Sequence, residues 1–285
     1  MPTVTRVIVM RHGHRHASDS RVPRIEHDPQ LTAKGQVQAQ QVATLLQQDR
    51  ALTGGVGISA IFCSPFVRAI QTAAPLAEAL QLPVHVDRGF GEIMPEPLGS
   101  PLGCLMYDTQ LPGSLPLVPP GVVVADSGSP QPPFPDIDGP EYYRQGDTGQ
   151  RARTVRRHRE GLERCFAAVE AASTGQDNDR AATILVVAHG CSSDFVGEAL
   201  CGNRFPSELH TARDGPAVPH VALTTLRRDD AHTRWEMVGF AVPTVSTENS
   251  NGGDGEAAEA ADDTAVMSAA CPTKSEERLC HRPKL

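Results

Sequence analysis

The feature that most constrains the fold is an alternation of short, β-branched apolar runs with segments of helical periodicity. The runs Val4–Met10, Ile58–Cys63 and Thr183–Ala188 are apolar enough for buried strands, and each is followed by a polar loop. Between them, Gln36–Leu46 and Phe66–Leu80 carry apolar residues at helical spacing. The pattern continues with a helix over Arg151–Ala172 and strands over Val221–Leu226 and Arg234–Ala241. This order predicts a three-layer α/β/α fold around a mostly parallel sheet.

Two stretches interrupt the alternation and set the expected domain limits. Twelve of the 24 prolines lie in residues 95–140, so we expect a long irregular insertion there that regular strand ladders do not accommodate. Residues 243–285 are rich in Gly, Ala, Asn and acidic side chains and have little apolar periodicity, which predicts a disordered acidic tail. One domain over residues 1–242, including the insertion, accounts for the rest of the chain.

The charge and hydropathy of the chain disfavour two classes of partner. The formal net charge is −8, with 26 Lys and Arg against 34 Asp and Glu, whereas a nucleic-acid binder normally carries a basic surface. No segment approaches the roughly 18 apolar residues of a membrane span. We therefore expect neither a nucleic-acid partner nor a membrane partner.

The seven cysteines favour a reducing compartment. They are odd in number and form neither a disulfide framework nor a C-x-x-C metal pair. The apolar run that ends at Met10 is too short for the core of a signal peptide, so we expect a cytoplasmic protein. The final Pro283-Lys284-Leu285 resembles the peroxisomal S-K-L address, which leaves peroxisomal import as an alternative.

Three of the predicted strands end in guanidinium or imidazole side chains. The first strand supplies Arg11, His12 and Arg15, the second leads to Arg68, and the third supplies His189. Ligands of open α/β sheets bind outside the carboxyl ends of the strands. Because guanidinium forks suit phosphoryl oxygens, we predict a site for a phosphate ester. A neutral imidazole in such a site can attack phosphorus and form a phosphohistidine that water later cleaves.

Several separate blocks together resemble the histidine phosphatase superfamily, which has the phosphoglycerate mutase-like fold. The blocks are Arg11-His12-Gly13, Leu31-Thr32 with Gly35, Gln38 and Ala39, Ser64-Pro65 with Arg68 and Gln71-Thr72-Ala73, Glu92, and His189-Gly190. The resemblance extends over residues 4–242. Within the superfamily, Arg15 and the segment Val218–Leu223 are similar to the subgroup of ecdysteroid-phosphate phosphatases and suppressor of T-cell receptor signalling phosphatases.

The resemblance assigns roles to six residues. It implies that His12 is the phosphorylated nucleophile and that an acid near Glu92 protonates the leaving oxygen. The transferring phosphoryl group would be held by Arg11, Arg15, Arg68 and His189. The implied enzyme is a phosphoric monoester hydrolase that needs no metal or cofactor and acts on a phosphorylated small molecule or a phosphoprotein. A homodimer stays open, and so does tautomer control of His12, because His14 stands where many relatives have Glu.

Other interpretations of the same residues stay open. The H-x-H-x-H run of His12, His14 and His16 is one that a metallohydrolase could use. A catalytically silent member that binds phosphorylated ligands, or a phosphoglycerate mutase-type phosphotransferase, is an alternative function. Glu96 or an acid of the insertion could replace Glu92 as the acid. The arginines between Arg151 and Arg159 are most simply a solvated helix face, or else a basic lip that attracts anionic substrates.

Overall fold

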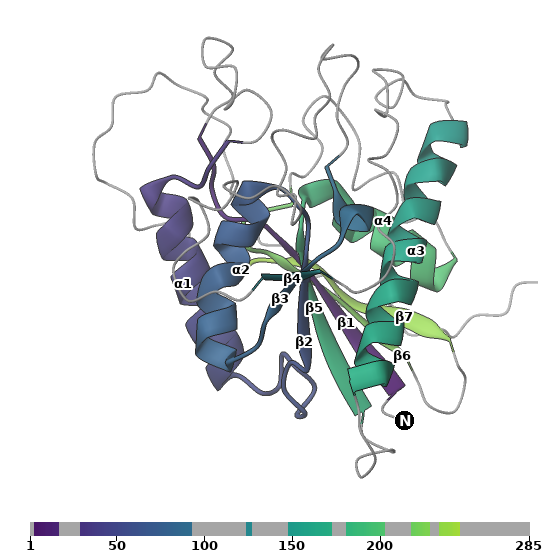
Figure 1. Ribbon diagram of the computed structural model, residues 1–285, viewed down its shortest axis with the longest axis horizontal. Helices are drawn as coiled ribbons and strands as arrows, with labels where there is room; N and C mark the ends of the chain where they lie inside the picture. Colours follow the sequence, from purple (N-terminus) through teal and green to yellow (C-terminus); the bar gives the residue numbers. More distant parts are fainter. Residues whose placement is uncertain are drawn as a thin grey trace, which may run out of the picture. The chain divides into compact units, whose positions relative to one another are not determined.

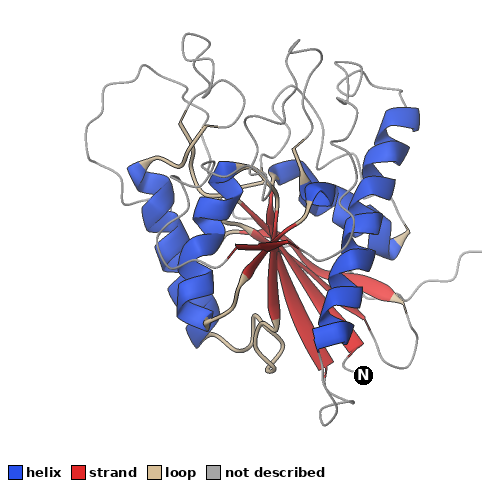
Figure 2. Cartoon of the chain, in the orientation of Figure 1, coloured by secondary structure: helices blue, strands red, loops and turns tan. Residues whose placement is uncertain are grey.

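A seven-stranded mixed sheet lies at the centre of the protein, and helices cover both of its faces (Figures 1 and 2). The computed structural model describes residues 3–16, 29–92, 124–126, 148–172, 181–202, 218–228 and 234–245, all within one compact unit, Met1–Asn249. The strands are β1 (Thr3–Arg11), β2 (Ala60–Cys63), β3 (Val84–Val86), β4 (Val124–Asp126), β5 (Ala181–Ala188), β6 (Leu223–Arg228) and β7 (Trp235–Val242). The helices are α1 (Ala33–Gln48), α2 (Val67–Leu80), the short 3₁₀ helix η1 (Arg88–Phe90), α3 (Thr148–Ala172) and α4 (Gly190–Cys201).

The order of the strands is β4-β3-β2-β5-β1-β6-β7. The five strands from β4 to β1 pair in parallel, while β6 runs antiparallel to β1 and β7 antiparallel to β6. The predicted α/β fold with a mostly parallel sheet is therefore confirmed. The chain moves outward from β1 through β2 and β3 to β4 and then returns to place β5 between β2 and β1. Since parallel crossovers are right-handed, the two directions of travel place helices on opposite faces of the sheet.

Alternate residues of the central strands enter two separate cores. In β1, Val7 and Val9 face one core, and Ile8 and Met10 face the other. Helices α1 and α2 close the second core with residues such as Leu46, whereas α3 and α4 close the first. A side chain of this size contributes about 1.5 to 3 kcal/mol when it is fully buried. Burial on both faces explains why these strands are continuous apolar runs.

Several elements differ from the sequence-based expectation. Strand β3, the short helix η1 and helix α4 were not predicted, because runs of three residues and an amphipathic stretch straight after a strand give weak signals. The prediction of an irregular insertion is wrong for residues 124–126. These residues form β4, which pairs with β3. The other residues of 95–140 lie outside the described part of the chain. So do residues 246–285 of the predicted tail, including Pro283-Lys284-Leu285.

Two further expectations concern the membrane and the cysteines. No helix among the described residues is long and apolar enough to cross a membrane. Cys63 and Cys165 are buried free thiols, and Cys191 and Cys201 are free and partly buried. The other three cysteines lie outside the described residues.

Candidate active site

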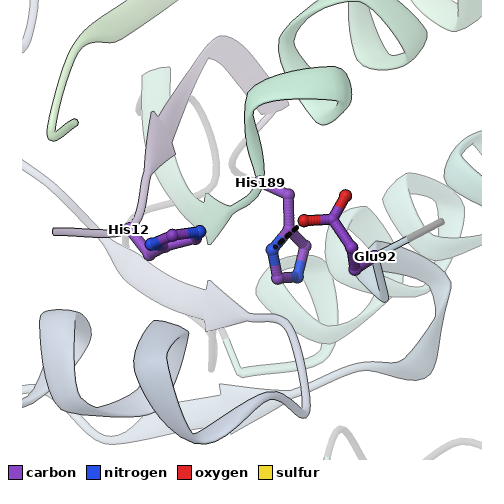
Figure 3. Close-up of side chains that lie close together, drawn as sticks. All are labelled: His12, Glu92 and His189. Carbon is purple, nitrogen blue, oxygen red and sulfur yellow. Dashed lines mark ion pairs between the residues drawn. The ribbon is translucent and has the colours of Figure 1, made fainter. Parts of the chain in front are cut away.

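The carboxyl ends of β1 and β5 place two histidines next to each other. Arg11 in β1 is in register with Ala188 in β5, and His12 and His189 directly follow these residues. The backbone N–H of His12 also donates to the oxygen of Ala188 at 2.9 Å, which fixes the relative position of the two strand ends. The two imidazole centres are 5.4 Å apart, and Glu92 lies beside His189 (Figure 3). Residues separated by more than 170 positions in the sequence therefore share one site.

The geometry around His12 keeps a lone pair on Nε2, which accepts from Arg68 Nε at 3.3 Å and is the candidate nucleophile. The Nδ1 atom lies 2.8 Å from the backbone oxygen of Gly13. A carbonyl only accepts hydrogen bonds, so Nδ1 carries the proton of the neutral ring and Nε2 keeps its lone pair. Burial, and then the charges of Arg68, His189 and Arg11, lower the pKa of His12 well below its ordinary value. The sequence left open what sets the tautomer of His12. In the structure, the backbone oxygen of Gly13 sets it.

Gly13 is required by the close approach of two loops. A Cβ atom at this position would lie 2.7 Å from the backbone oxygen of Gly35. The N–H of Gly13 donates to Thr72 Oγ1 at 3.0 Å, and that hydroxyl donates to the oxygen of Arg68 at 2.7 Å. The loop that carries His12 is therefore tied directly to the first turns of α2.

Arg68 lies at the centre of the site and contacts the three other groups. Its Nε atom is 3.3 Å from His12 Nε2, and its Nη2 atom is 3.3 Å from His189 Nδ1 and 3.4 Å from Glu92 Oε2. The guanidinium carbon also lies 4.4 Å from the centre of the Phe66 ring. A buried guanidinium in this place presents its fork of donors between the two histidines, where a phosphoryl group would sit.

The other two predicted arginines meet the site in different ways. Arg11 donates from one terminal nitrogen to the oxygen of Val218, while its Nε atom is buried and has no partner among the described residues. An anion that accepts from this Nε would remove the cost of an unpaired buried donor. Arg15 donates to the oxygen of His16 at 3.0 Å and contacts neither site histidine in the described part of the chain. The structure therefore brings Arg11 to the site and leaves Arg15 at its edge.

Glu92 and His189 form a close pair. Glu92 Oε2 is 3.0 Å from His189 Nδ1, and the thiol of Cys191 donates to Oε1 at 3.1 Å. Burial lowers the pKa of His189 to about 4, although Glu92 opposes the shift. Burial alone would raise the pKa of Glu92, but His189, Arg68 and the Cys191 contact together lower it well below its ordinary value. In the free protein Glu92, whose side chain is 27% exposed, is ionised at neutral pH.

Side chains of α3 bind the loop that carries Glu92. One terminal nitrogen of Arg157 donates to the backbone oxygens of Arg88, Gly89 and Gly91, at 3.4, 3.1 and 3.0 Å. Just before this loop, Asp87 accepts two hydrogen bonds of 2.7 Å from Arg164. Asp87 also caps η1 by accepting from the N–H of Gly89. The position of Glu92 therefore depends on two arginines of a helix that follows it by more than 50 residues.

The arginine-rich part of α3 is not a uniformly solvated face, so that expectation is corrected. Arg157 is buried against the Glu92 loop. Arg151 pairs with Asp194 at 2.8 Å and with Glu198. The residues that remain exposed are Arg153, Arg156 and Arg159. The spacing of the run fits a helix, but only the packing against η1 and α4 distinguishes the buried arginines from the exposed ones.

A divalent metal is the alternative occupant of the site. Ligand atoms of His12, Glu92 and His189 all lie within 4.8 Å of one another, and two imidazoles with one carboxylate are a donor set that zinc enzymes use. Arg68 contacts all three groups at 3.3 to 3.4 Å, so a dication among them would meet a fixed positive charge. The electrostatics of the site favour an anion over a metal.

The other members of the H-x-H-x-H run do not join this group. His14 Nδ1 lies 2.8 Å from Thr32 Oγ1, and His16 is exposed. Among the described residues, the run therefore contributes one histidine to the site, not the three that a metallohydrolase would use.

His220 is a site residue that the sequence did not single out. Its ring centre lies 5.8 Å from that of His12 and 5.2 Å from that of His14. The next residue, Val221, has a φ of 55°, a strained conformation for a β-branched side chain, and its N–H donates to the oxygen of Arg11 at 3.1 Å. The segment 218–223 contributes to the subgroup resemblance, but its position over His12 comes from the fold.

Comparison with known proteins finds a family likeness over part of the chain. Residues 7–96 match the sequence profile of the histidine phosphatase superfamily (branch 1). This segment is similar to that superfamily. The matched segment carries His12, Arg68 and Glu92, and His189 is brought to them by β5. The match supports phosphatase or phosphotransferase chemistry at this site.

Solved structures agree on the histidine phosphatase fold. Ecdysone phosphate phosphatase from Bombix mori, in complex with tungstate, is 17% identical and covers 88% of this chain and 98% of its own, with a TM-score of 0.53. A mycobacterial glucosyl-3-phosphoglycerate phosphatase, in complex with inorganic phosphate, is 19% identical and covers 85% of this chain and all of its own, with a TM-score of 0.50. At these identities the likeness establishes the fold.

One curated protein has a similar segment. The 55 kDa subunit of transcription factor tau from Saccharomyces cerevisiae is 33% identical over 103 residues, which are 31% of this chain. The match spans 21% of the length of that subunit.

Proposed function

We propose that this protein is a histidine phosphatase that hydrolyses phosphate monoesters through a phosphohistidine on His12, without a metal ion. The observation that carries the proposal is the Nδ1 contact of His12 with Gly13, which leaves a neutral Nε2 lone pair beside the Arg68 guanidinium. The positive charges of Arg68 and Arg11 suit the charge spread over the phosphoryl oxygens in a loose transition state.

The first half of the reaction transfers the phosphoryl group to the protein. His12 Nε2 attacks phosphorus as the bond to the ester oxygen breaks, and Glu92 gives a proton to the leaving alcohol. Glu92 is ionised in the free protein, so it must first gain this proton. A monoanionic phosphate ester can bring one, and the remaining negative charge of the ester raises the pKa of the nearby carboxyl group. We therefore expect turnover to favour the monoanionic ester.

The second half returns the protein to its starting state. Glu92, now a carboxylate, takes a proton from water as the water oxygen attacks phosphorus. The phosphorus–nitrogen bond to His12 breaks and returns the lone pair to Nε2. Glu92 passes its proton to the departing inorganic phosphate and is again a carboxylate. Burial keeps the pKa of His12 well below 6.5, so the neutral nucleophile persists at mildly acidic pH.

For the natural substrate we propose a chemical class. A phosphorylated small molecule or a phosphoprotein fits the chemistry of the site. The named substrates of the structural neighbours, an ecdysone phosphate and a glucosyl phosphoglycerate, are both small phosphate esters. Steroid phosphates and sugar phosphates are therefore the first esters to assay.

A screen of phosphate esters with the wild-type protein and the His12→Ala variant tests the proposal. We expect wild type to release phosphate from an aryl phosphate in the presence of EDTA, and the folded variant to release almost none. A wild-type protein that binds phosphate or vanadate but hydrolyses no ester would instead support a silent member of the family. Activity lost on chelation and restored by zinc or manganese would favour the metal alternative.

A further inference from the structure

Ser64 lies beneath His189 and contacts the ring nitrogen that faces away from Glu92. Its side chain is fully buried at the carboxyl end of β2. Its backbone N–H donates to the oxygen of Val187 at 2.9 Å, which ties it to β5 just before His189. Ser64 Oγ lies 2.8 Å from His189 Nε2, which is shorter than the contacts of this imidazole with Glu92 and Arg68. The mechanism described above gives this hydroxyl no role.

The hydrogen bonds around Ser64 determine which way its proton points. The N–H of Phe66 lies 3.4 Å from Ser64 Oγ and can only donate to it. His189 Nε2 is the sole atom within hydrogen-bonding distance, among the described residues, that can accept from this hydroxyl. If Nε2 carried the proton instead, the hydroxyl hydrogen of Ser64 would be buried without an acceptor. That arrangement costs about 1 to 3 kcal/mol.

We propose that Ser64 is a positioning residue, which donates to Nε2 of His189 and thereby keeps the proton of the neutral ring on Nδ1. The inference rests on the proposed function, because it concerns how His189 meets the phosphoryl group. On the other side of the ring, Nδ1 lies 3.0 Å from Glu92 Oε2, which accepts when ionised, and 3.3 Å from Arg68 Nη2, which can only donate. The shorter contact, with the carboxylate, favours a proton on Nδ1.

The contribution of Ser64 grows once a phosphate ester is bound. When Glu92 holds a proton for the leaving alcohol, it is a weaker acceptor for His189 Nδ1 than the carboxylate is. The Ser64 hydroxyl then remains to hold Nε2 as an acceptor. His189 therefore presents an N–H, and not a lone pair, to the phosphoryl oxygen. A lone pair in that place would repel the oxygen at the moment when negative charge is transferred.

The tautomer of His189 can be measured in the free wild-type protein by nitrogen NMR of the labelled imidazoles. We expect His189 at pH 7 to carry its proton on Nδ1, with the pyridine-type signal assigned to Nε2. A proton found on Nε2 would overturn the inference. This measurement needs no turnover, so it decides the question even if the wild-type protein hydrolyses no ester and the proposed function fails.

Variants test the consequence for the reaction. Ser64→Ala should show a mixture of both His189 tautomers and lower kcat and kcat/KM together by about tenfold, the size of one hydrogen bond. The matched control is Thr183→Val, which removes a buried hydroxyl at the opposite end of β5 and should leave the tautomer and the rate unchanged. A Ser64→Ala protein that keeps the Nδ1–H tautomer and the wild-type kcat would contradict the proposal.

Discussion

The two sides of the active site are built in different ways. On the nucleophile side, His12 and Arg68 are fixed by contacts within two short motifs, through Gly13 and Thr72. On the acid side, Glu92 depends on arginines of α3, a helix that follows it across the long insertion. Both sides therefore rest on tertiary contacts. The nucleophile side joins two motifs that the sequence shows, whereas the acid side depends on packing against α3 that no motif shows.

This difference predicts where each side is vulnerable. Substitutions on the nucleophile side should affect all phosphate esters alike, because attack and charge stabilisation are needed for every leaving group. Substitutions on the acid side should affect esters with poor leaving groups most, because only these need a proton.

Removing the acid should give the largest selective loss. Glu92→Gln should slow hydrolysis of an alkyl phosphate by about 10² to 10⁴-fold and hydrolysis of nitrophenyl phosphate much less, because nitrophenolate leaves without a proton. Steady-state rates with both substrates measure the ratio. Equal losses on the two substrates would show that Glu92 only shapes the pocket and would return the role of acid to Glu96 or the insertion.

The arginines of the nucleophile side should separate into two classes. Arg11→Ala should lower kcat by on the order of 10² to 10³-fold for both substrates, as for other lost transition-state donors, and should weaken inhibition by vanadate. Arg15→Ala should cost less than about tenfold, since Arg15 lies at the edge of the site. Similar losses in the two variants would place Arg15 in direct contact with the phosphoryl group when substrate is bound.

Loosening the Glu92 loop should reproduce the acid defect in weaker form. Arg157→Gln removes a guanidinium that holds three backbone oxygens, so we expect about a 10 to 10²-fold loss on alkyl phosphates and a smaller loss on nitrophenyl phosphate. Arg156→Gln is the matched control, because Arg156 is exposed on the same helix and should retain full activity. An Arg157→Gln loss of equal size on both substrates would break the proposed link between α3 and the acid.

Low pH should lower the free energy of unfolding of the whole protein. The pKa of buried His189 is lowered to about 4 and that of buried His158 to about 3. A histidine with a lowered pKa in the folded state binds its proton first in the unfolded state, so the free energy of unfolding falls as pH drops below about 6.5. Each of these two histidines should lower the free energy of unfolding by on the order of 3 kcal/mol when the pH has fallen to its pKa in the folded state. Urea unfolding between pH 7 and 4 measures the slope, and a flat profile would contradict the burial of neutral histidines.

The sequence was informative where chemistry and local structure coincide. The apolar strands and the residues that follow them predict the sheet, the site edge and the meeting of His12, Arg68 and His189. The sequence could not reveal that Arg157 turns inward while Arg156 stays in solvent, since both occupy one arginine-rich helix. Nor could it place His220 over His12, because that contact depends on the pairing of β6 with β1. Three-residue strands such as β4 are too short to show a period of two.

Trapping the covalent intermediate shows whether His12 is the nucleophile. Wild-type protein would be mixed with a ³²P-labelled aryl phosphate and quenched in alkali, where phosphohistidine survives, and the labelled site located by peptide mass spectrometry. We predict acid-labile phosphate on His12 in wild type and in Glu92→Gln, and none in His12→Ala. Rapid turnover with no label on His12, or label on another residue, would show that His12 is not the nucleophile.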